Sequence, residues 1–157
     1  MPVEVEQGLL PSILDRLIDP ESAGTAILIG YDANGMRDSV RRDLEDLLNT
    51  RQTHAGMPEG YQELNRSVLA YGLPDVLTLE AITGKQREEI GEKIRRIIGL
   101  FEPRLRDVTV RYLPGENAAQ RSIRFHIDAR LCVDPAPEVA FDTVLELTSG
   151  QYAVNNA

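Results

Sequence analysis

The residues with the clearest chemical potential form the segment Glu102-Pro103-Arg104, where a helical pattern gives way to a strand pattern. Pro103 cannot continue a helix and pushes the residue before it out of the helical region. Glu102 therefore falls at a helix C-terminus, where the helix dipole disfavours a carboxylate by about 0.3–1 kcal/mol. We expect a cation to offset this cost, either Arg104 or Arg96 of the same chain or a cation supplied by a partner.

Three interpretations of this segment follow from its residue types. Glu102 and Arg104 can form a capping ion pair within the chain, because an arginine can grip a carboxylate through two hydrogen bonds. They can instead clamp another subunit. Glu102 can also be the general acid of a glycoside hydrolase, which needs a second carboxylate about 5–10 Å away. Asp107 is the acid nearest to it in sequence after the joint.

Little else in the sequence favours an enzyme. Sugar clefts are usually lined by aromatic rings, and the chain has five Tyr, three Phe and no Trp. It has no Gly-x-Ser-x-Gly nucleophile motif and no glycine-rich phosphate loop ahead of a helix. Its single cysteine, Cys132, and its two histidines, His54 and His126, lack metal-site spacing. We therefore predict no catalytic residue, no metal, no cofactor and no small-molecule substrate.

The overall charge restricts the class of partner. A formal net charge of -8 repels phosphate backbones and anionic lipid, so nucleic acid and membranes are disfavoured as partners. The N-terminus lacks the basic start and apolar run of a signal peptide, and apolar stretches such as 26–29 are far shorter than a membrane span. These features predict a soluble cytoplasmic protein without membrane insertion.

Helical spacing of apolar residues predicts three helices, over 9–18, about 38–49 and 84–101. The first is short and amphipathic, with Ser12 as its N-cap and an apolar face that includes Leu10, Leu14 and Leu17. It either docks on its own domain or is lent to a partner. Asn34-Gly35 is a turn signal, so we predict an N-terminal helix and linker over 1–36 and one domain over 37–157.

After Pro103 the apolar period changes to two, which predicts half-buried strands over 108–112, 123–133 and 139–147. Helices first and strands later is the α+β order, with the N-terminal helices packed on a small C-terminal antiparallel sheet. An exposed edge of such a sheet can accept a strand from another chain. The strand from about Val139 to Tyr152, with Asp142 and Val144, or its neighbour, is the predicted docking edge.

Five short motifs, in order along the chain, resemble the TssE family of type VI secretion baseplate proteins. They are Leu14-Asp15-Arg16-Leu17, the helix over 39–51, the corner Tyr71-Gly72-Leu73-Pro74-Asp75, the Glu-Pro-Arg motif at 102–104 and the C-terminal segments 141–143 and 149–152. TssE is similar to the baseplate wedge protein of contractile phages, once described as lysozyme-like. The resemblance covers roughly residues 9–154, and the segments 19–36 and 51–66 contribute little to it.

The resemblance implies a structural role in the bacterial cytoplasm, in a baseplate near the inner membrane. The implied partners are the wedge proteins TssF, TssG and TssK and the sheath proteins TssB and TssC, whose first ring the sheet would template. Glu102, Pro103 and Arg104 would then lie at a wedge interface. Three alternatives remain open at this point: a wedge protein of a prophage or other contractile tail, a peptidoglycan hydrolase, and a free-standing adaptor that docks through its N-terminal helix.

Overall fold

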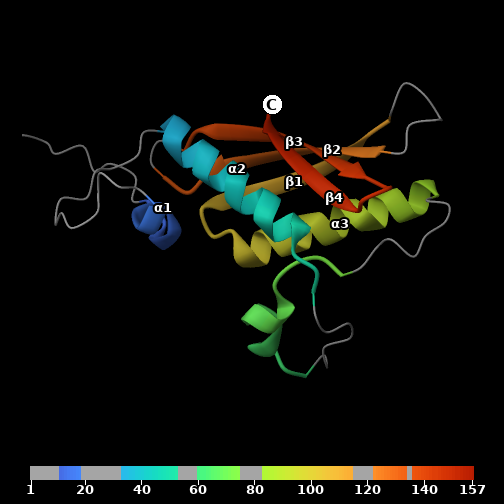
Figure 1. Ribbon diagram of the computed structural model, residues 1–157, viewed down its shortest axis with the longest axis horizontal. Helices are drawn as coiled ribbons and strands as arrows, with labels where there is room; N and C mark the ends of the chain where they lie inside the picture. Colours follow the sequence, from blue (N-terminus) through green and yellow to red (C-terminus); the bar gives the residue numbers. More distant parts are fainter. Residues whose placement is uncertain (1–10, 19–32, 53–59, 75–82, 115–121, 134–135) are drawn as a thin grey trace, which may run out of the picture. The chain divides into compact units, whose positions relative to one another are not determined.

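The computed structural model describes residues 11–18, 33–52, 60–74, 83–114, 122–133 and 136–157. Leu10 lies outside these residues. The elements are α1 (Ile13–Ile18), α2 (Ala33–Asn49), α3 (Gly84–Phe101), two short 3-10 turns (Leu64–Arg66 and Val68–Ala70) and strands β1 (Leu105–Leu113), β2 (Ser122–Leu131), β3 (Glu138–Glu146) and β4 (Gln151–Asn156) (Figure 1). The predicted α+β class is confirmed. Among the described residues, no helix is both long and apolar enough to cross a lipid bilayer.

The chain divides into two compact units, Met1–Val40 and Arg41–Ala157, so that α2 begins in the first and ends in the second. In the first unit, α1 has the predicted N-cap. The Asp15 N–H donates to Ser12 Oγ at 3.1 Å, and Asp15 Oδ2 accepts from the Ser12 main-chain N–H at 3.0 Å. Asp15 Oδ2 also accepts from the Ser39 hydroxyl at 2.7 Å, which ties the buried side of α1 to α2.

The predicted turn at Asn34-Gly35 is wrong, because both residues lie in the first turn of α2. The N–H groups of a first helical turn have no acceptor inside the helix, so an Asn or Gly there costs far less than in a helix interior. The helix therefore starts five residues before the predicted Asp38 and ends at the predicted Asn49.

In the second unit, α3 has the predicted limits. It begins with a capping box in which the Thr83 hydroxyl accepts from the Gln86 N–H and the Gln86 side chain accepts from the Thr83 N–H. The apolar stripe is buried as predicted, with Ile94 and Ile98 fully inaccessible. The helix packs on β1 and β2, since a β-carbon built at Gly91 would lie 3.6 Å from the Phe125 ring and 3.8 Å from the Val110 side chain.

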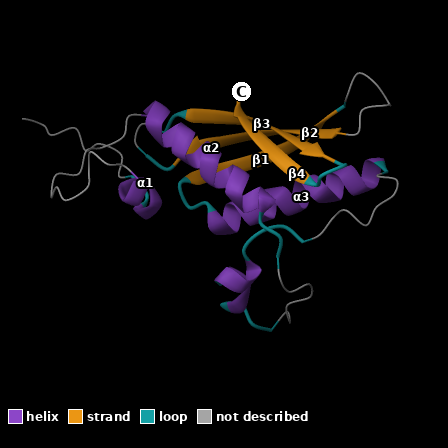
Figure 2. Cartoon of the chain, viewed as in Figure 1, coloured by secondary structure: helices purple, strands orange, loops and turns teal. Residues whose placement is uncertain are grey.

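The four strands form one antiparallel sheet in the order β1-β2-β3-β4 (Figure 2). The covered face carries the core side chains of β2, β3 and β4, among them Phe125, Phe141 and Leu145, all fully buried. The opposite face of the sheet carries the alternating polar side chains, and below it is called the open face. A bulge in β1 between Arg106 and Thr109, with Asp107 at φ 55°, places both Leu105 and Val108 on the covered side.

The predicted strand from about Val139 to Tyr152 is wrong as a single element. The structure divides it into β3 and β4, joined by a turn in which the Gly150 N–H donates to the Glu146 carbonyl at 2.7 Å. Gly150 has φ 69°, a left-handed conformation that glycine adopts without a steric penalty. As a result β3 lies inside the sheet and β4 forms the edge.

Candidate interaction sites

The joint between α3 and β1 holds a cluster of charged side chains, Asp43, Glu102 and Arg104, here called the Arg104 cluster. Arg104 grips Glu102 through two hydrogen bonds, Nε to Oε1 at 2.7 Å and Nη2 to Oε2 at 2.6 Å. The Arg104 main-chain N–H also donates to Glu102 Oε1 at 3.2 Å. Of the cations that the sequence offered to Glu102, the structure selects Arg104, and Arg96 is exposed on α3.

The second carboxylate of the cluster comes from α2. Arg104 Nη2 donates to Asp43 Oδ2 at 2.6 Å, and Asp43 Oδ1 accepts from Arg42 Nη2 at 2.6 Å. One guanidinium therefore bonds to α2 and to the C-terminus of α3 at the point where β1 begins. Burial alone would lower the pKa of Arg104, but the hydrogen bonds and charges of Glu102 and Asp43 raise it above its ordinary value.

The predicted corner at 71–75 packs beside this joint, as far as Pro74, the last residue described there. The Tyr71 ring lies edge-on to Phe101, with 5.3 Å between the ring centroids. Gly72 has φ 98°, and a β-carbon there would lie 2.3 Å from the Thr50 carbonyl oxygen, so only glycine fits. Leu73 fixes the corner to the end of α2, because its N–H donates to the Thr50 carbonyl at 2.9 Å.

Glu102 is poorly placed for acid catalysis. Its residue is only 4% exposed, and both carboxylate oxygens accept hydrogen bonds from Arg104. A general acid must carry a proton and reach its substrate, whereas this carboxylate is buried against a permanent cation. Pro103 is exposed at the surface of the joint. Among the described residues, no group of three His, Cys, Asp or Glu side chains could hold a metal ion.

A second cluster of charged side chains lies on the open face and is here called the His126 cluster. His126 Nδ1 lies 2.5 Å from Asp142 Oδ1 on β3, and His126 Nε2 lies 3.1 Å from Asp128 Oδ1 on β2. Arg111 of β1 donates to Asp128 Oδ2 at 2.6 Å. The hydrogen bond to Asp142 raises the pKa of His126, the charge of Asp128 adds to this, and partial burial opposes it.

The structure thus gives Asp142 a partner within the chain, and it places Val144 half-buried on the same open face. The main chain of β3 pairs with β2 on one side and β4 on the other. A strand from another chain therefore cannot pair with β3, which corrects the part of the sequence prediction that named this strand as the docking edge. The side chains of Asp142 and Val144 stay predicted contact residues on the open face.

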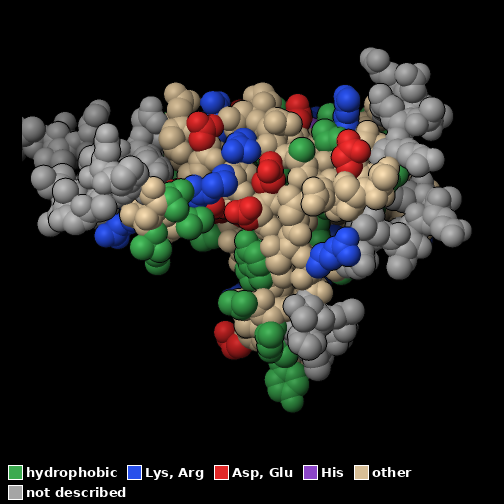
Figure 3. Space-filling model, viewed as in Figure 1, with side chains coloured by type: hydrophobic (Ala, Val, Ile, Leu, Met, Phe, Trp, Pro, Cys, Tyr) green, Lys and Arg blue, Asp and Glu red, His purple; other side chains and the backbone are tan. Residues whose placement is uncertain are grey.

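The solvent-facing surface of α1 is largely apolar. Leu14 is 45% exposed and Leu17 is 78% exposed, and Figure 3 shows apolar side chains gathered on this helix. Asp15, by contrast, is 2% exposed. The helix therefore docks within its own unit through Asp15 and presents Leu14 and Leu17 outward. Contact of this outward face with a partner stays a prediction.

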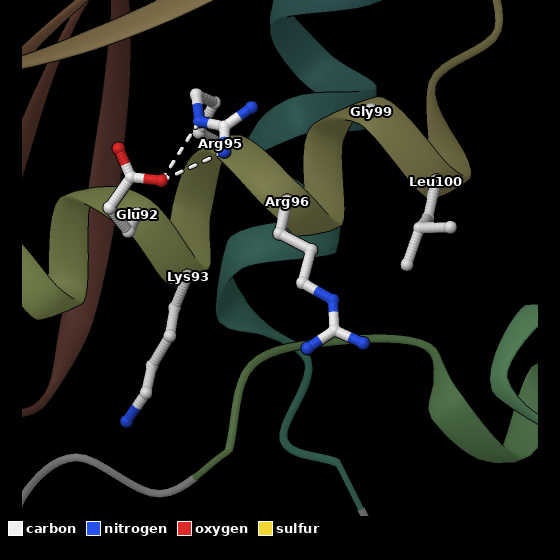
Figure 4. A pocket seen from close by; sticks show the side chains of 6 residues that line it. All are labelled: Glu92, Lys93, Arg95, Arg96, Gly99 and Leu100. Atoms are coloured by element: carbon white, nitrogen blue, oxygen red, sulfur yellow. Dashed lines mark hydrogen bonds and ion pairs between the residues drawn. The ribbon is translucent and has the colours of Figure 1, made fainter. Parts of the chain in front are cut away.

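An open pocket of about 460 Å³ runs along α3, lined by Glu92, Lys93, Arg95, Arg96, Gly99 and Leu100 (Figure 4). Glu92 is engaged by Arg95, whose Nη2 donates to Glu92 Oε2 at 2.8 Å. The Lys93 and Arg96 side chains extend on the same side of the helix (Figure 4). A single paired carboxylate beside cations is no arrangement for acid–base catalysis.

Three polar residues of α2, Arg41, Glu45 and Asn49, bind the main chain of β4. Asn49 exchanges two hydrogen bonds with Tyr152, with Tyr152 N–H donating to Asn49 Oδ1 at 2.8 Å and Asn49 Nδ2 donating to the Tyr152 carbonyl at 2.9 Å. Glu45 and Arg41 bond to Val154 in the same way. The sequence signal for these contacts was the spacing of four residues between Arg41, Glu45 and Asn49, because this spacing places all three on one face of α2.

Comparison with known proteins supports this picture of a protein built for contacts. A family model described as "Baseplate wedge protein gp25" matches residues 34–136, more than half of the chain. The matched range contains the whole Arg104 cluster. No curated protein and no solved structure gave a significant match.

Proposed function

Because the chain belongs to the gp25 family of baseplate wedge proteins, we propose that it is the TssE-like subunit of a type VI secretion baseplate. In this role it is a structural component without catalysis, working in the bacterial cytoplasm near the inner membrane. Its partners are TssF, TssG and TssK in the wedge and TssB and TssC in the first sheath ring. The family match carries the proposal, and the five TssE-like motifs favour the secretion branch over a phage tail.

The Arg104 cluster supports an assembly role by fixing the shape of the joint. Its guanidinium bonds to α2 and to the end of α3 at once, with three side-chain hydrogen bonds of 2.6–2.7 Å. These bonds hold the exposed Pro103 at a defined position on the surface. In the wedge, partner subunits recognise this rigid joint, and the cluster acts by positioning it.

The exposed face of α1 supports a second contact. Two leucines of one short helix, both more than two-fifths exposed, are unfavourable in water and stabilise the chain only when a partner covers them. We assign this surface to a wedge partner. Replacing Leu17 by Asp leaves the buried Asp15 contacts in place and should reduce capture of that partner.

Co-purification tests the wedge role directly. Tagged wild type is expressed with TssF, TssG and TssK and compared with a Glu102→Ala/Arg104→Ala variant whose fold is checked by circular dichroism and denaturant unfolding. The matched control is Glu92→Ala/Arg95→Ala, which removes an exposed Glu–Arg pair from α3. We expect wild type and control to co-purify with the wedge proteins and the joint variant to lose them.

Other outcomes are equally informative. If the folded joint variant co-purifies as well as wild type, the Arg104 cluster stabilises the fold only and the binding surface lies elsewhere. If wild type captures none of the wedge proteins, the secretion-baseplate assignment fails. A wedge role in a prophage tail is then the next candidate, and tail genes beside this one would identify it.

A further inference from the structure

We propose that the open pocket along α3 binds an acidic segment of another protein, with carboxylates on Lys93 and Arg96 and an apolar side chain on Leu100. The main chain of this segment passes over Gly99. The proposal deepens the assembly role and rests on it, because the segment belongs to a partner in that assembly. None of the described lining residues belongs to the Arg104 cluster, so this surface is a separate one.

Three side chains of the pocket project from one side of α3. Lys93, Arg96 and Leu100 follow one another at spacings of three and four residues, which places them along one face of a helix. Figure 4 shows these side chains extending to the same side, with the Glu92–Arg95 pair on a different side. The pocket therefore presents two cations in a row followed by one apolar side chain.

The two cations have no acid to neutralise them. Within the described part of the chain, no ion pair or hydrogen bond involves the side chain of Lys93 or Arg96. The one acid among the described lining residues, Glu92, is held by Arg95 through hydrogen bonds of 3.0 and 2.8 Å. The helix dipole favours cations in the last turn of a helix, and the last turn of α3 has none. The dipole therefore does not account for these cations, which form a positive surface on a chain of net charge -8.

The C-terminal end of the pocket allows a close approach. Gly99 lies within α3 although glycine destabilises a helix relative to alanine. A β-carbon built there would meet no described atom of another part of the chain within 4 Å, so the packing of the fold does not require glycine. Because no side chain stands in the way, another main chain can come close to the helix here. Leu100 is 38% exposed, and covering it with apolar atoms is favourable.

Charge complementarity selects an acidic segment as the occupant. A helix rises about 1.5 Å per residue, so Lys93 and Arg96 lie about 4.5 Å apart along the axis and Leu100 about 6 Å further on. Two neighbouring acids followed by an apolar residue match this order. Glu88 and Glu89 are exposed about one turn before Lys93. They repel further acids, which limits the acidic part of the occupant to a short stretch.

Peptide binding to the full chain tests the pocket without any partner. The probe is a fluorescein-labelled peptide of the repeat Glu-Glu-Leu-Gly, followed by fluorescence anisotropy, and the same peptide with Lys in place of Glu is its control. We expect only the acidic peptide to bind, and more weakly at about 0.5 M than at about 0.05 M salt, because exposed charges are screened.

Charge reversal locates the binding site. Lys93→Glu/Arg96→Glu should lower the affinity for the acidic peptide at least about tenfold. Lys85→Glu/Arg66→Glu makes the same change in net charge at exposed positions outside the pocket and should leave the affinity unchanged. Equal affinity of wild type and the Lys93→Glu/Arg96→Glu variant, or equal binding of the Glu and Lys peptides, would overturn the proposal.

Gly99→Ala separates binding from folding. It should raise the urea midpoint, since alanine favours a helix, and it should lower the affinity for the acidic peptide several-fold, since the methyl group blocks the close approach. A purely structural residue would not move these two measurements in opposite directions. Wild-type affinity in Gly99→Ala would show that the segment does not pass over this residue.

Co-purification carries the test into the assembly. Folded Lys93→Glu/Arg96→Glu should capture less TssF, TssG or TssK than Lys85→Glu/Arg66→Glu does, whereas Glu92→Ala/Arg95→Ala keeps both cations of the pocket and should capture as wild type. Undiminished capture of all three by the folded reversal variant would overturn the proposal. So would self-association in sedimentation that the reversal abolishes, because the occupant is then a second copy of this chain. If wild type captures none of the three, the proposed function fails, and the peptide experiment still decides the pocket.

Discussion

The Arg104 and His126 clusters are each centred on one cation between two carboxylates, but they differ in burial and in what they join. The side chains of Glu102, Arg104 and Asp43 are 5%, 22% and 22% exposed. Those of Asp128 and Asp142 around His126 are 42% and 49% exposed. The first cluster connects two helices to the start of the sheet, whereas the second connects strands that main-chain hydrogen bonds already hold together.

The difference in burial determines how much each cluster contributes to the free energy of folding. A buried carboxylate without its cation is left with a large desolvation penalty, so the Arg104 cluster is strongly coupled to the fold. An exposed carboxylate is solvated by water whether or not it is paired, so the His126 cluster contributes little to the free energy of folding. The arginine stays charged at every relevant pH, while the histidine can lose its proton within the physiological range.

The largest effect is expected from Arg104→Ala. This change leaves Glu102 buried without its cation and leaves Asp43 with only one of its two cations. The free energy of unfolding should therefore fall by about 3–5 kcal/mol. Urea unfolding followed by circular dichroism measures the change. Arg104→Lys keeps the charge but cannot form the two-pronged grip, so it should fall between wild type and the alanine variant. A loss below about 1 kcal/mol for Arg104→Ala would mean that the cluster does not brace the joint.

A smaller loss is expected from Asp43→Asn. This change removes the charge on the α2 side, while Arg104 keeps both bonds to Glu102. Losing a hydrogen bond to a charged group costs about 1.5–3 kcal/mol, so the unfolding free energy should fall by less than in Arg104→Ala. An equal or larger loss would place the main contact of Arg104 on α2 and not at the helix C-terminus.

The sequence narrowed the cation beside Glu102 to Arg104, Arg96 or one supplied by a partner, but it gave no sign of the contact between Arg104 and α2, for a physical reason. Pro103 and the helix dipole act locally, so a carboxylate at this joint requires a nearby cation, and Arg104 is two residues away. Asp43 is 61 residues away from Arg104, and only the packing of α2 against the joint brings it close. Likewise, the regular spacing of Ile90, Ile94 and Ile97 was enough to define α3.

The sheet shows the same limit. Strands β1 to β3 carry long period-two patterns, and the structure contains all three. Strand β4 has only two buried apolar residues, Tyr152 and Val154, in six, which is too short a pattern to separate from the tail of β3. The β4 edge is bonded by Asn49 and Glu45 more than a hundred residues earlier, so no local pattern could predict these contacts.

The His126 cluster should give a stability that depends on pH. Both ring nitrogens face carboxylate oxygens, and only the protonated ring can donate from both. Since the folded pKa is raised above its usual value of 6.5, this contribution is fully present below pH 6.5 and is lost as the pH rises through the folded pKa. Arg111, Asp128 and Asp142 are the charged groups facing the ring from the three strands.

An NMR titration of the His126 ring measures this shift. In Asp142→Asn the largest cause of the raised pKa is removed, so the His126 pKa should fall toward 6.5. The unfolding midpoint of wild type should drop between pH 6 and pH 9 by more than that of His126→Gln. Identical pH profiles for the two proteins would show that the cluster is not coupled to folding.

The smallest effect is expected for an exposed ion pair of the same residue types. Arg95 and Glu92 form a close ion pair on α3, but their side chains are 49% and 67% exposed. Water solvates both charges when the pair is broken, and ordering two long side chains offsets what attraction remains. Glu92→Gln should therefore leave the urea midpoint unchanged at physiological salt. A clear destabilisation there would mean that pairing itself stabilises this protein, and the contrast between the Arg104 and His126 clusters could then no longer be attributed to burial.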